Sequence, residues 1–273
     1  MVYEIKSVER RFLINGFVSA FEFIWNDRYV FSGENHDFWE VVFVTDGEVD
    51  VTEDEKVYVL KSGDMILHAP GEFHTIRSRK GSSPKGYIIS FSASGELPPT
   101  LKEGIFSIEE GEKAFYLDVF SKINLFILAD RNNEHVGQEA SELLAAFLIR
   151  LGSSPTSHHL NLSPAAKEYC AVVSRMTEAV CENVSLEDIA NRNGISVSYV
   201  KFLFRKYAGV SPKAYYTNLR VQYAQKLLCE GMSVSSVSDK MNFSSPNYFS
   251  TFYKKHTGVL PGEVKRMNRQ ERE

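Results

Sequence analysis

The sequence predicts an α+β protein in which a β-barrel and an added pair of helices precede an all-α domain with two helix-turn-helix units. Residues 3–91 consist of short runs rich in aromatic and β-branched residues, separated by turn signals. Residues 112–151 change to helical periodicity. Residues 185–209 and 233–258 then repeat one pattern, a short capped helix, a turn and a second capped helix. A chain of 273 residues is comfortable for two domains.

The first half is expected to form a small barrel or jelly roll, because many short strands follow one another at close spacing. Asp46-Gly47 is a hairpin signal, and Gly63-Asp64 and Pro70-Gly71 mark further turns. Both faces of the run 38–44 are nearly apolar, so alternation does not decide which of its side chains point inward. The expected strands are Phe12–Ile14, Val18–Trp25, Phe38–Thr45, Glu48–Thr52, Val57–Leu60, Met65–Ala69 and Tyr87–Phe91.

Two helices are expected next, from the apolar spacing in 114–127 and in 134–151. They offer more apolar surface than one small barrel covers, so the surplus either packs on the barrel or pairs two subunits. Residues 152–157 are a linker by composition. Ser163-Pro164 then caps a helix expected at about 165–182.

The last helix-turn-helix unit has the clearest signals. Val234, Val237 and Met241 form one apolar stripe on a short helix. Asn242 tolerates a left-handed conformation and is expected at the turn. Ser245-Pro246 begins the second helix, with Ser245 as its N-cap. Its core stripe is expected at Phe249, Phe252 and Tyr253.

The earlier unit repeats this arrangement. Leu186 and Ile189 lie on one face of its first helix, Gly194 marks the turn and Ser196 caps the second helix. Between the two units, residues 212–228 predict one helix of roughly 25 Å, which approaches the roughly 34 Å between successive major-groove faces of B-DNA. Tyr199, Val200 and Leu203 are expected to point inward.

The charge of the chain is divided unevenly. Residues 1–160 hold 15 Lys and Arg against 25 Asp and Glu, whereas residues 161–273 hold 16 against 10. A cationic domain suits binding to phosphates of double-stranded DNA, and the acidic half does not. The three cysteines lack C-x-x-C spacing, which indicates neither a disulfide framework nor a zinc site. The apolar runs are far shorter than a membrane helix, so we expect a cytoplasmic protein without membrane contact.

Two tandem units, each closed by K-x-x-G-V or K-K-x-x-G-V, resemble the AraC/XylS family of bacterial transcription regulators. The departures from the family pattern are Ser238, Asn242, Thr251 and Leu260, and Thr251 weakens the transfer of the base contact that the family makes there. The residues that match the family signature are Ala224, Leu227, Leu228, Phe243, Tyr248, Phe249, Ser250, Lys254, Lys255, Gly258 and Pro261.

The outer faces of the two second helices supply the expected DNA contacts. Lys201 suits the acceptors of guanine and Asn247 suits adenine. Side chains late in such a helix are expected on phosphates. The expected base contacts are Val197, Ser198, Lys201, Phe202, Asn247 and Thr251, and the expected phosphate contacts are Arg205, Lys206, Lys254 and Lys255.

The first hundred residues resemble the cupin-type sensor domain that precedes the DNA-binding domain in many of these regulators. In the pattern Glu34-x-His36-x3-Glu40, the first histidine of the cupin motif is replaced by Glu34. His36, Glu40 and His74 stand where the metal ligands of the cupin family would stand. Three interpretations remain open: satisfied polar residues at the barrel end, a metal site, or a metal-free pocket for an organic effector. The pocket is favoured, formed by Glu34, His36, Phe38, Glu40 and His74, and no cofactor is expected.

The resemblance implies a regulator, and an activator by the family's habit, in which a small sugar-like effector alters how a homodimer sits on DNA. Contact with RNA polymerase is compatible with this function, although no residue indicates it. The expected domains are a sensor at 1–110, a helical dimerisation segment at 111–152, a linker at 153–162 and a DNA-binding domain at 163–273. One alternative is a DNA-binding protein whose first domain only dimerises. The other is a cupin metalloenzyme, which the two recognition-type helices disfavour, so no enzymatic activity is expected.

Overall fold

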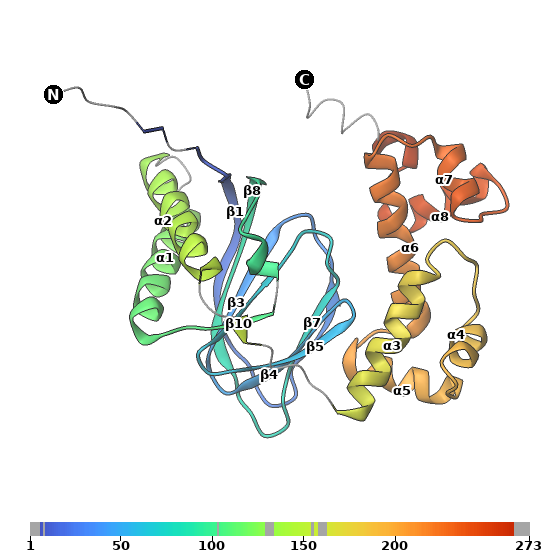
Figure 1. The fold of residues 1–273 in the computed structure, drawn as a ribbon, viewed down its shortest axis with the longest axis horizontal. Coiled ribbons are helices and arrows are strands. Elements are labelled where there is room, and N and C mark those ends of the chain that lie inside the picture. Colours follow the sequence, from blue (N-terminus) through green and yellow to red (C-terminus); the bar gives the residue numbers. More distant parts are fainter. Residues whose placement is uncertain are drawn as a thin grey trace. The chain divides into compact units, whose positions relative to one another are not determined.

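The computed structural model describes residues 6–7, 9–102, 104–128, 134–153, 156–157 and 163–264. The chain divides into two units, Met1–Asn161 and Leu162–Glu273. The first unit contains antiparallel sheets and two long helices, and the described residues of the second unit form helices (Figure 1). This arrangement confirms the predicted fold class. Most of the predicted linker lies outside the described residues.

The strands of the first unit form two sheets. The six-stranded sheet has the order β1-β8-β3-β6-β9-β10, and the four-stranded sheet has the order β2-β7-β4-β5. Paired strands are antiparallel throughout both sheets. The strands are β1 (Phe12–Ile24), β2 (Val30–Glu34), β3 (Trp39–Asp46), β4 (Glu48–Glu53), β5 (Lys56–Lys61), β6 (Asp64–His68), β7 (His74–Ser78), β8 (Lys85–Gly95), β9 (Ile105–Ser107) and β10 (Thr156–Ser157), with a short 3-10 helix η1 at Pro99–Lys102.

Strand β1 corrects one sequence expectation, because it is continuous where two separate strands were predicted. Its register against β8 shifts between Ile14 and Gly16 and again between Phe17 and Ser19. Irregularities of this kind let a strand continue through residues that interrupt its alternation. Strand β7 was not predicted from the sequence. Four of its five residues, HTIRS, are polar, so it contains no apolar run that would indicate a strand.

Strand β3 separates two hydrophobic cores. Val41 and Phe43 belong to a core between the six-stranded sheet and the helices, whereas Val42 and Val44 belong to a core between the two sheets. Successive side chains of a strand point to opposite faces, so both faces of β3 are buried. This explains why the run is apolar throughout, and it decides the orientation that the sequence left open.

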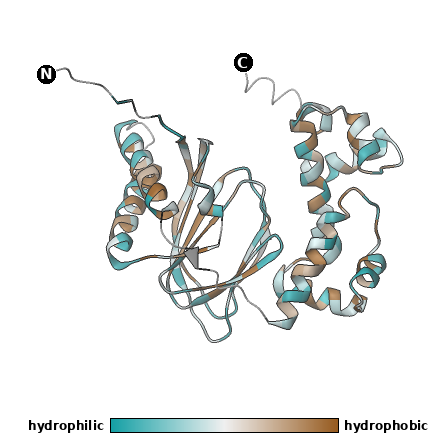
Figure 2. Ribbon diagram, viewed as in Figure 1, coloured by the Kyte–Doolittle hydropathy of each residue, from teal (hydrophilic) through white to brown (hydrophobic). Residues whose placement is uncertain are grey.

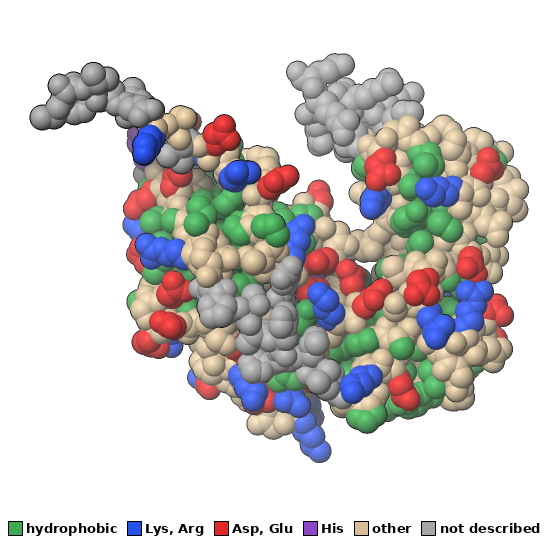
Figure 3. Space-filling view, viewed as in Figure 1, with side chains coloured by type: hydrophobic (Ala, Val, Ile, Leu, Met, Phe, Trp, Pro, Cys, Tyr) green, Lys and Arg blue, Asp and Glu red, His purple; other side chains and the backbone are tan. Residues whose placement is uncertain are grey.

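Helices α1 (Glu110–Leu128) and α2 (Glu134–Gly152) pack against each other and against β1 (Figure 1). Their inner residues, including Phe120 and Leu144, join the core that contains Val41. Packing on the sheet therefore uses much of their apolar surface. Leu125, Leu128 and Ile149 nevertheless remain exposed, and hydrophobic side chains gather over these helices on the face seen in Figure 3.

Helices α3 to α8 make up most of the described part of the second unit, and a serine caps the N-terminus of each of the six. A serine oxygen accepts the otherwise unpaired N–H groups of the first turn, which fixes where each helix begins. Brown and teal alternate along α3 in Figure 2, as expected for an amphipathic helix. The helices are α3 (Pro164–Glu178), α4 (Leu186–Arg192), α5 (Val197–Tyr207), α6 (Pro212–Cys229), α7 (Val234–Lys240) and α8 (Pro246–Thr257).

The two helix-turn-helix units are α4–α5 and α7–α8, and their turns are left-handed as the sequence predicts. Gly194 has φ of 67° in the first turn, and Asn242 has φ of 55° in the second. Helix α3 ends at Glu178, four residues before the predicted end, because residues 179–181 form a turn. Among the residues that the structure describes, every helix is too short or too polar to cross a bilayer.

Helix α6 contacts both helix-turn-helix units, the first near its start and the second near its middle. Near its start, the rings of Tyr215 and Phe204 meet edge to face at 5.2 Å, and the Tyr216 hydroxyl donates to the carbonyl of Ala179 at 2.6 Å. Farther along, Arg220 Nη2 donates to the carbonyl of Met241 at 2.6 Å, in a buried contact at the second turn. The helix is thus fixed to both units.

Candidate functional site

Helix α5 buries one face and leaves the other exposed. Val200, Leu203 and Phe204 are fully buried in the core of the unit. Tyr199, expected to point inward, is only half-buried and stacks on Phe202 with ring centroids 5.7 Å apart. The predicted contacts lie in two adjacent rows at intervals of four residues: Val197, Lys201 and Arg205 in one row, and Ser198, Phe202 and Lys206 in the other.

All of these α5 side chains are exposed except that of Val197, which is half-buried. Phe202 is 40% exposed, which is unusual for a large apolar residue on a polar face. Lys206 Nζ lies over the Tyr207 ring, 4.9 Å from its centroid. The exposed face of α5 therefore combines three cations with one aromatic ring.

Helix α8 presents a comparable face. Asn247, Thr251, Lys254 and Lys255 are exposed and follow one another at helical intervals. The Thr251 hydroxyl donates to the carbonyl of Asn247 at 3.0 Å, so its oxygen remains available only as an acceptor.

Two residues of α8 differ from the expectation. Phe252, assigned to the core stripe, is half-buried. Tyr248 is 58% exposed and was not among the expected DNA contacts. Tyr248 lies in the first turn of α8 beside Asn247, and this position could have identified it as a candidate DNA contact.

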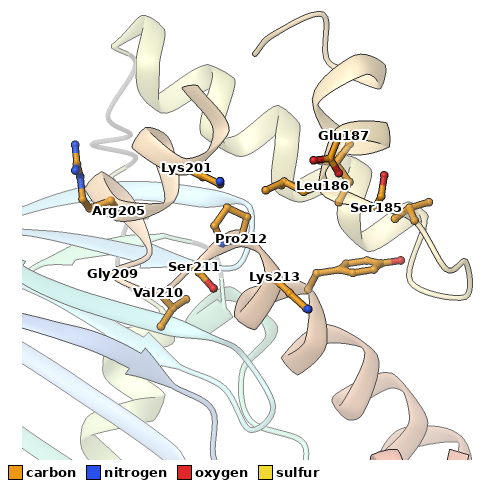
Figure 4. A pocket seen from close by; sticks show the side chains of 13 residues that line it. Ser185, Leu186, Glu187, Lys201, Arg205, Gly209, Val210, Ser211, Pro212 and Lys213 are labelled. Atoms are coloured by element: carbon orange, nitrogen blue, oxygen red, sulfur yellow. The ribbon is translucent and has the colours of Figure 1, made fainter. Parts of the chain in front are cut away.

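A hollow of about 680 Å³ lies beside α5 in the first helix-turn-helix unit. Figure 4 shows Lys201 and Arg205 of α5 on one side of it, with Lys213 at the start of α6 on another. The cations surround a lining that includes Leu186, Val210 and other apolar residues. Lys213 was not among the expected DNA contacts; it is exposed in the first turn of α6, directly after the capping Ser211 and Pro212. The three cations extend the basic surface from α5 to α6.

A second candidate site lies at one end of the barrel interior. Glu40 shares its face of β3 with Val42, and His68 shares its face of β6 with Ile66, so both side chains point between the two sheets. The strand register places Glu40 opposite His68. The partners of His74 are Glu34 on one side and Glu53 on the other. Four of these polar side chains, Glu40, Glu53, His68 and His74, thus converge inside the barrel, while Glu34 lies exposed at its rim.

The predicted pocket residues do come together there. His74 Nε2 lies 3.4 Å from Glu40 Oε1, and the hydroxyl of Ser90 donates to Glu40 Oε2 at 3.1 Å. The His36 ring stacks on Phe38 with centroids 3.7 Å apart and meets the His74 ring edge to face at 5.0 Å. Glu34 is exposed at the rim and belongs to one possible metal-binding group with His36 and His74.

Burial and neighbouring charges set the protonation of these groups. Burial lowers the pKa of His36, and the nearby His74 adds to the effect. Burial alone would lower the pKa of His74, but the Glu40 carboxylate outweighs it and raises that pKa. Burial alone would raise the pKa of Glu40, but the imidazoles of His74 and His68 outweigh it and lower that pKa. His74 and Glu40 therefore stabilise each other as an ion pair.

His68, Glu53 and Glu72 also lie at this site, although the sequence did not predict them there. His68 is completely buried, and burial holds its pKa well below the ordinary value of histidine. Glu53 and Glu72 form a hydrogen-bonded carboxyl pair beside it. His68 could have been identified as the single histidine in the apolar run Met65–Ala69. Both faces of this strand are buried, so its side chain had to lie in one of the two cores.

Two groups of residues at this site have the composition of a metal site. Glu34, His36 and His74 form one, and Glu40, His68 and His74 form the other; within each group the possible ligand atoms lie within 4.8 Å of one another. Imidazole nitrogens and carboxylate oxygens together suit first-row transition ions. The same groups can hydrogen-bond the hydroxyls of an organic ligand.

Two family models match the chain. A model of the AraC-like ligand binding domain matches residues 23–102, and a model of the helix-turn-helix domain matches residues 189–267. The first covers the barrel with its polar end. The second covers α5 and α8 with their exposed faces.

Curated relatives match over most of the chain. The HTH-type transcriptional activator RhaR of Shigella dysenteriae is 23% identical over 257 residues, which cover 88% of this chain and 89% of RhaR. RhaR of an Escherichia coli strain is also 23% identical, over 263 residues that cover 89% and 91% of the two chains.

Among solved structures, an AraC-type DNA-binding domain from Chromobacterium violaceum is 31% identical, covering 37% of this chain and 91% of that one, with a TM-score of 0.35. ToxT of Vibrio cholerae in a fatty-acid-bound form is 15% identical over 96% of this chain and 97% of ToxT, with a TM-score of 0.36. The two family models agree with the curated RhaR relatives. The chain belongs to the AraC family of DNA-binding transcription regulators, with an AraC-like ligand-binding domain followed by a helix-turn-helix domain.

Proposed function

We propose that this regulator is a homodimeric activator whose barrel binds a small polyhydroxylated effector, such as a sugar, and thereby alters how α5 and α8 engage an operator. The observation that carries the proposal is that one chain joins two exposed, cation-bearing helices to a barrel with a polar interior end. The RhaR relatives are named transcriptional activators, which supports activation. Since the target is DNA, we propose that the protein acts in the cytoplasm.

On the DNA, Lys201 and Asn247 are proposed to contact base edges, because both are exposed near the middle or start of their helices. Val197, Ser198, Phe202 and Thr251 complete the proposed base-contacting set. Arg205, Lys206, Lys254 and Lys255 lie later in the same helices and are proposed to bind phosphates. The exposed cation Lys213 joins this phosphate-binding set.

In the barrel, Glu34, His36, Phe38, Glu40 and His74 are the proposed effector contacts. Carboxylate and imidazole groups hydrogen-bond hydroxyls, and the Phe38 ring offers an apolar surface for the C–H face of a sugar ring. A signal from the effector to DNA also requires that subunits pair. Leu125, Leu128 and Ile149 on the outer faces of α1 and α2 are the proposed dimer contacts, because they are exposed and apolar.

A thermal-shift screen tests the effector. The full-length protein, kept in a chelator, is heated with mono- and disaccharides, plant-wall oligosaccharides and amino acids. A sugar that binds only the native state raises the melting temperature, with about 2.7 kcal/mol of stabilisation at 100 times its Kd. The rise should disappear in a His36→Ala, His74→Ala double variant and persist in His135→Ala, which alters an exposed histidine of α2.

If an amino acid shifts the melting temperature and no sugar does, the effector is not a sugar. The barrel would still be an effector-binding pocket, but for another class of ligand. If a sugar stabilises the double variant as well as the wild type, the effector binds elsewhere. A protein that responds to no compound and still binds DNA as a dimer would have a first unit that only dimerises.

A further inference from the structure

The hollow beside α5 has an apolar floor that phosphate binding does not explain. Ile189 and Pro212 are buried in its lining, and Leu186 and Val210 are half-buried there. A DNA phosphate is strongly hydrated, and contact with such side chains would cost it water without supplying a hydrogen bond. The cations around the hollow suit DNA, but the floor indicates an occupant with an apolar body.

The hollow has the dimensions of a ligand pocket. Its volume of about 680 Å³ lies within the roughly 300–1,000 Å³ that is typical of small-molecule sites. Three segments of the chain enclose it: residues 184–189 at the start of α4, one side of α5, and residues 209–216 leading into α6 (Figure 4). All three belong to the second unit, so the pocket is complete within that unit.

Most uncharged polar side chains of the lining already have partners. Ser185 and Ser211 serve as the N-caps of α4 and α6, and the hydroxyl of Tyr216 donates to a backbone carbonyl at 2.6 Å. Lys201 and Lys213, in contrast, form no ion pair with any residue that the structure describes. The two amines are therefore the groups available to a polar part of a ligand.

The charges around the hollow favour an anion. Lys201, Arg205 and Lys213 contribute three cations, whereas Glu187 is the one acidic residue among the described residues that line it. Figure 4 shows the Lys201 amine directed toward Leu186, over the apolar floor. Lys213 lies in the first turn of α6, where the peptide dipoles of an 18-residue helix add partial positive charge.

We infer that this hollow binds a small organic anion with an apolar body, such as an aromatic carboxylate, and that the bound anion keeps DNA off the first helix-turn-helix unit. The anionic group pairs with the amines of Lys201 and Lys213 through charge-assisted hydrogen bonds. The apolar body covers Leu186 and Val210. Because Lys201 is also the proposed base contact, ligand and DNA compete for one amine.

The inference adds a ligand site that lies outside the barrel. Binding of the anion does not rest on the proposed function, whereas its effect on DNA rests on the proposed contact of Lys201. The coupling is reciprocal, so bound DNA should lower the affinity for the anion by the same factor. The anion is thus a negative effector that acts without the barrel pocket.

The test uses full-length protein and biphenyl-4-carboxylate as the probe, titrated by isothermal calorimetry. We expect one probe per chain and at least about tenfold weaker binding of the uncharged biphenyl-4-carboxamide. Lys213→Met removes the charge, keeps the apolar stem and should weaken binding about 10- to 100-fold, the usual loss for a hydrogen bond to a charged group. Lys226→Met, at an exposed position of the same helix, is the matched control and should bind as the wild type does.

Two further variants test the apolar lining. Val210→Asp places an acidic group in it and should abolish binding of the probe. Leu186→Ser serves if Val210→Asp fails to fold, as judged by circular dichroism, and should weaken binding several-fold because it removes apolar contact.

The effect on DNA is measured by fluorescence anisotropy with a labelled duplex that the protein selects from a random library. Strict competition multiplies the apparent Kd for DNA by one plus the ratio of probe concentration to probe Kd. At ten times its Kd, the probe should therefore raise the apparent Kd for DNA by up to about 11-fold. Lys213→Met should abolish most of this rise at the same probe concentration.

Absence of saturable binding, or equal binding of the carboxamide, overturns the inference. Full binding by both Lys213→Met and Val210→Asp also overturns it, because the probe would then occupy another site. If the probe binds and leaves DNA affinity unchanged, while Lys201→Ala weakens DNA binding, the competition is wrong and the proposed DNA contact of Lys201 stands. The inference and the proposed function therefore fail separately.

Discussion

Glu53 and Glu72 are hydrogen-bonded to each other through their carboxyl groups inside the barrel end, and Glu53 also contacts the buried ring of His68 at 3.3 Å. Burial raises the pKa of Glu53 to about 7, and burial together with the charge of Glu53 raises that of Glu72 to about 7. Two carboxyl groups this close do not both ionise readily. The pair therefore keeps a proton near neutral pH.

Glu53→Gln should stabilise the protein at pH 8. A folded pKa above the ordinary 4.5 means that the native state binds more protons than the unfolded chain between pH 4.5 and 7, so stability falls as pH rises through that window. A neutral glutamine avoids this loss, donates to Glu72 and still accepts from His68. Urea unfolding at pH 5 and pH 8 should show a gain of about 1–3 kcal/mol at pH 8 only. Glu109→Gln, at an exposed position, is the control, and a wild-type pH slope in Glu53→Gln would contradict this account.

Arg220→Met should destabilise the second helix-turn-helix unit. The guanidinium donates to the buried carbonyl of Met241 and lies 4.4 Å from the Phe243 ring centroid. Without it, a buried carbonyl is left unsatisfied, which costs about 1–3 kcal/mol. Arg192→Met removes only an exposed ion pair with Glu182 and should cost less than about 1 kcal/mol. Chemical unfolding of both variants measures the difference, and equal stabilities would refute the role of Arg220.

Asn242→Ala should cost about 1–2 kcal/mol, because alanine is disfavoured at φ of 55°. Asn242→Gly should be nearly neutral, since glycine adopts this conformation freely. Gly194→Ala at φ of 67° should be destabilising in the same way. The control is Gly262→Ala, where the added Cβ meets no atom within 4 Å. Denaturant unfolding would reject the argument if Asn242→Ala and Asn242→Gly were equally stable.

Lys201→Ala and Lys254→Ala should weaken DNA binding in different ways. Loss of a base contact by Lys201 should cost about 1–3 kcal/mol on the operator and relax preference at one base pair. Loss of a phosphate contact by Lys254 should weaken binding to all sequences and reduce the salt slope by about one unit. Fluorescence anisotropy on operator and random duplexes, with the exposed Lys226→Ala of α6 as control, measures both. Identical behaviour of Lys201→Ala and Lys254→Ala would show that the two roles are wrongly assigned.

Leu128→Ser combined with Ile149→Ser should convert the proposed homodimer to a monomer. The two side chains are 75% and 53% exposed on α1 and α2, where water contact of apolar groups is unfavourable without a partner. Sedimentation velocity over a concentration series measures the oligomeric state. Val30→Ser, at an exposed position of β2, should leave that state unchanged. A double variant that sediments as the wild type would exclude this face from the dimer interface.

The helices of the second half of the chain, residues 163–264, were predicted well because the residues that start and end them act locally. Ser196 and Ser245 mark helix starts, and Gly194 and Asn242 occupy the left-handed turns that separate the helices. Each of these preferences acts within a few residues of the chain. The inward and outward faces of α5 and α8 then follow from the helical period.

The barrel was predicted less completely because its site depends on contacts distant in the chain. Glu53 directly follows the predicted strand Glu48–Thr52 and was expected in the polar turn after it, yet it is buried against His68, fifteen residues away. Local sequence does not contain the register that brings β4, β6 and β7 together. The predicted pocket residues His36, Glu40 and His74 were found only through their spacing in a known motif.

Helix α6 has a consequence for how such a regulator can change over evolution. It is one unbroken helix that contacts the first helix-turn-helix unit through Tyr215 and the second through Arg220. One inserted residue would turn everything beyond it by about 100° and advance it by about 1.5 Å. The exposed face of α8 would then be rotated away from its present orientation relative to that of α5. New target sequences are therefore accessible by exchanging side chains on α5 and α8, while insertions and deletions in α6 are selected against.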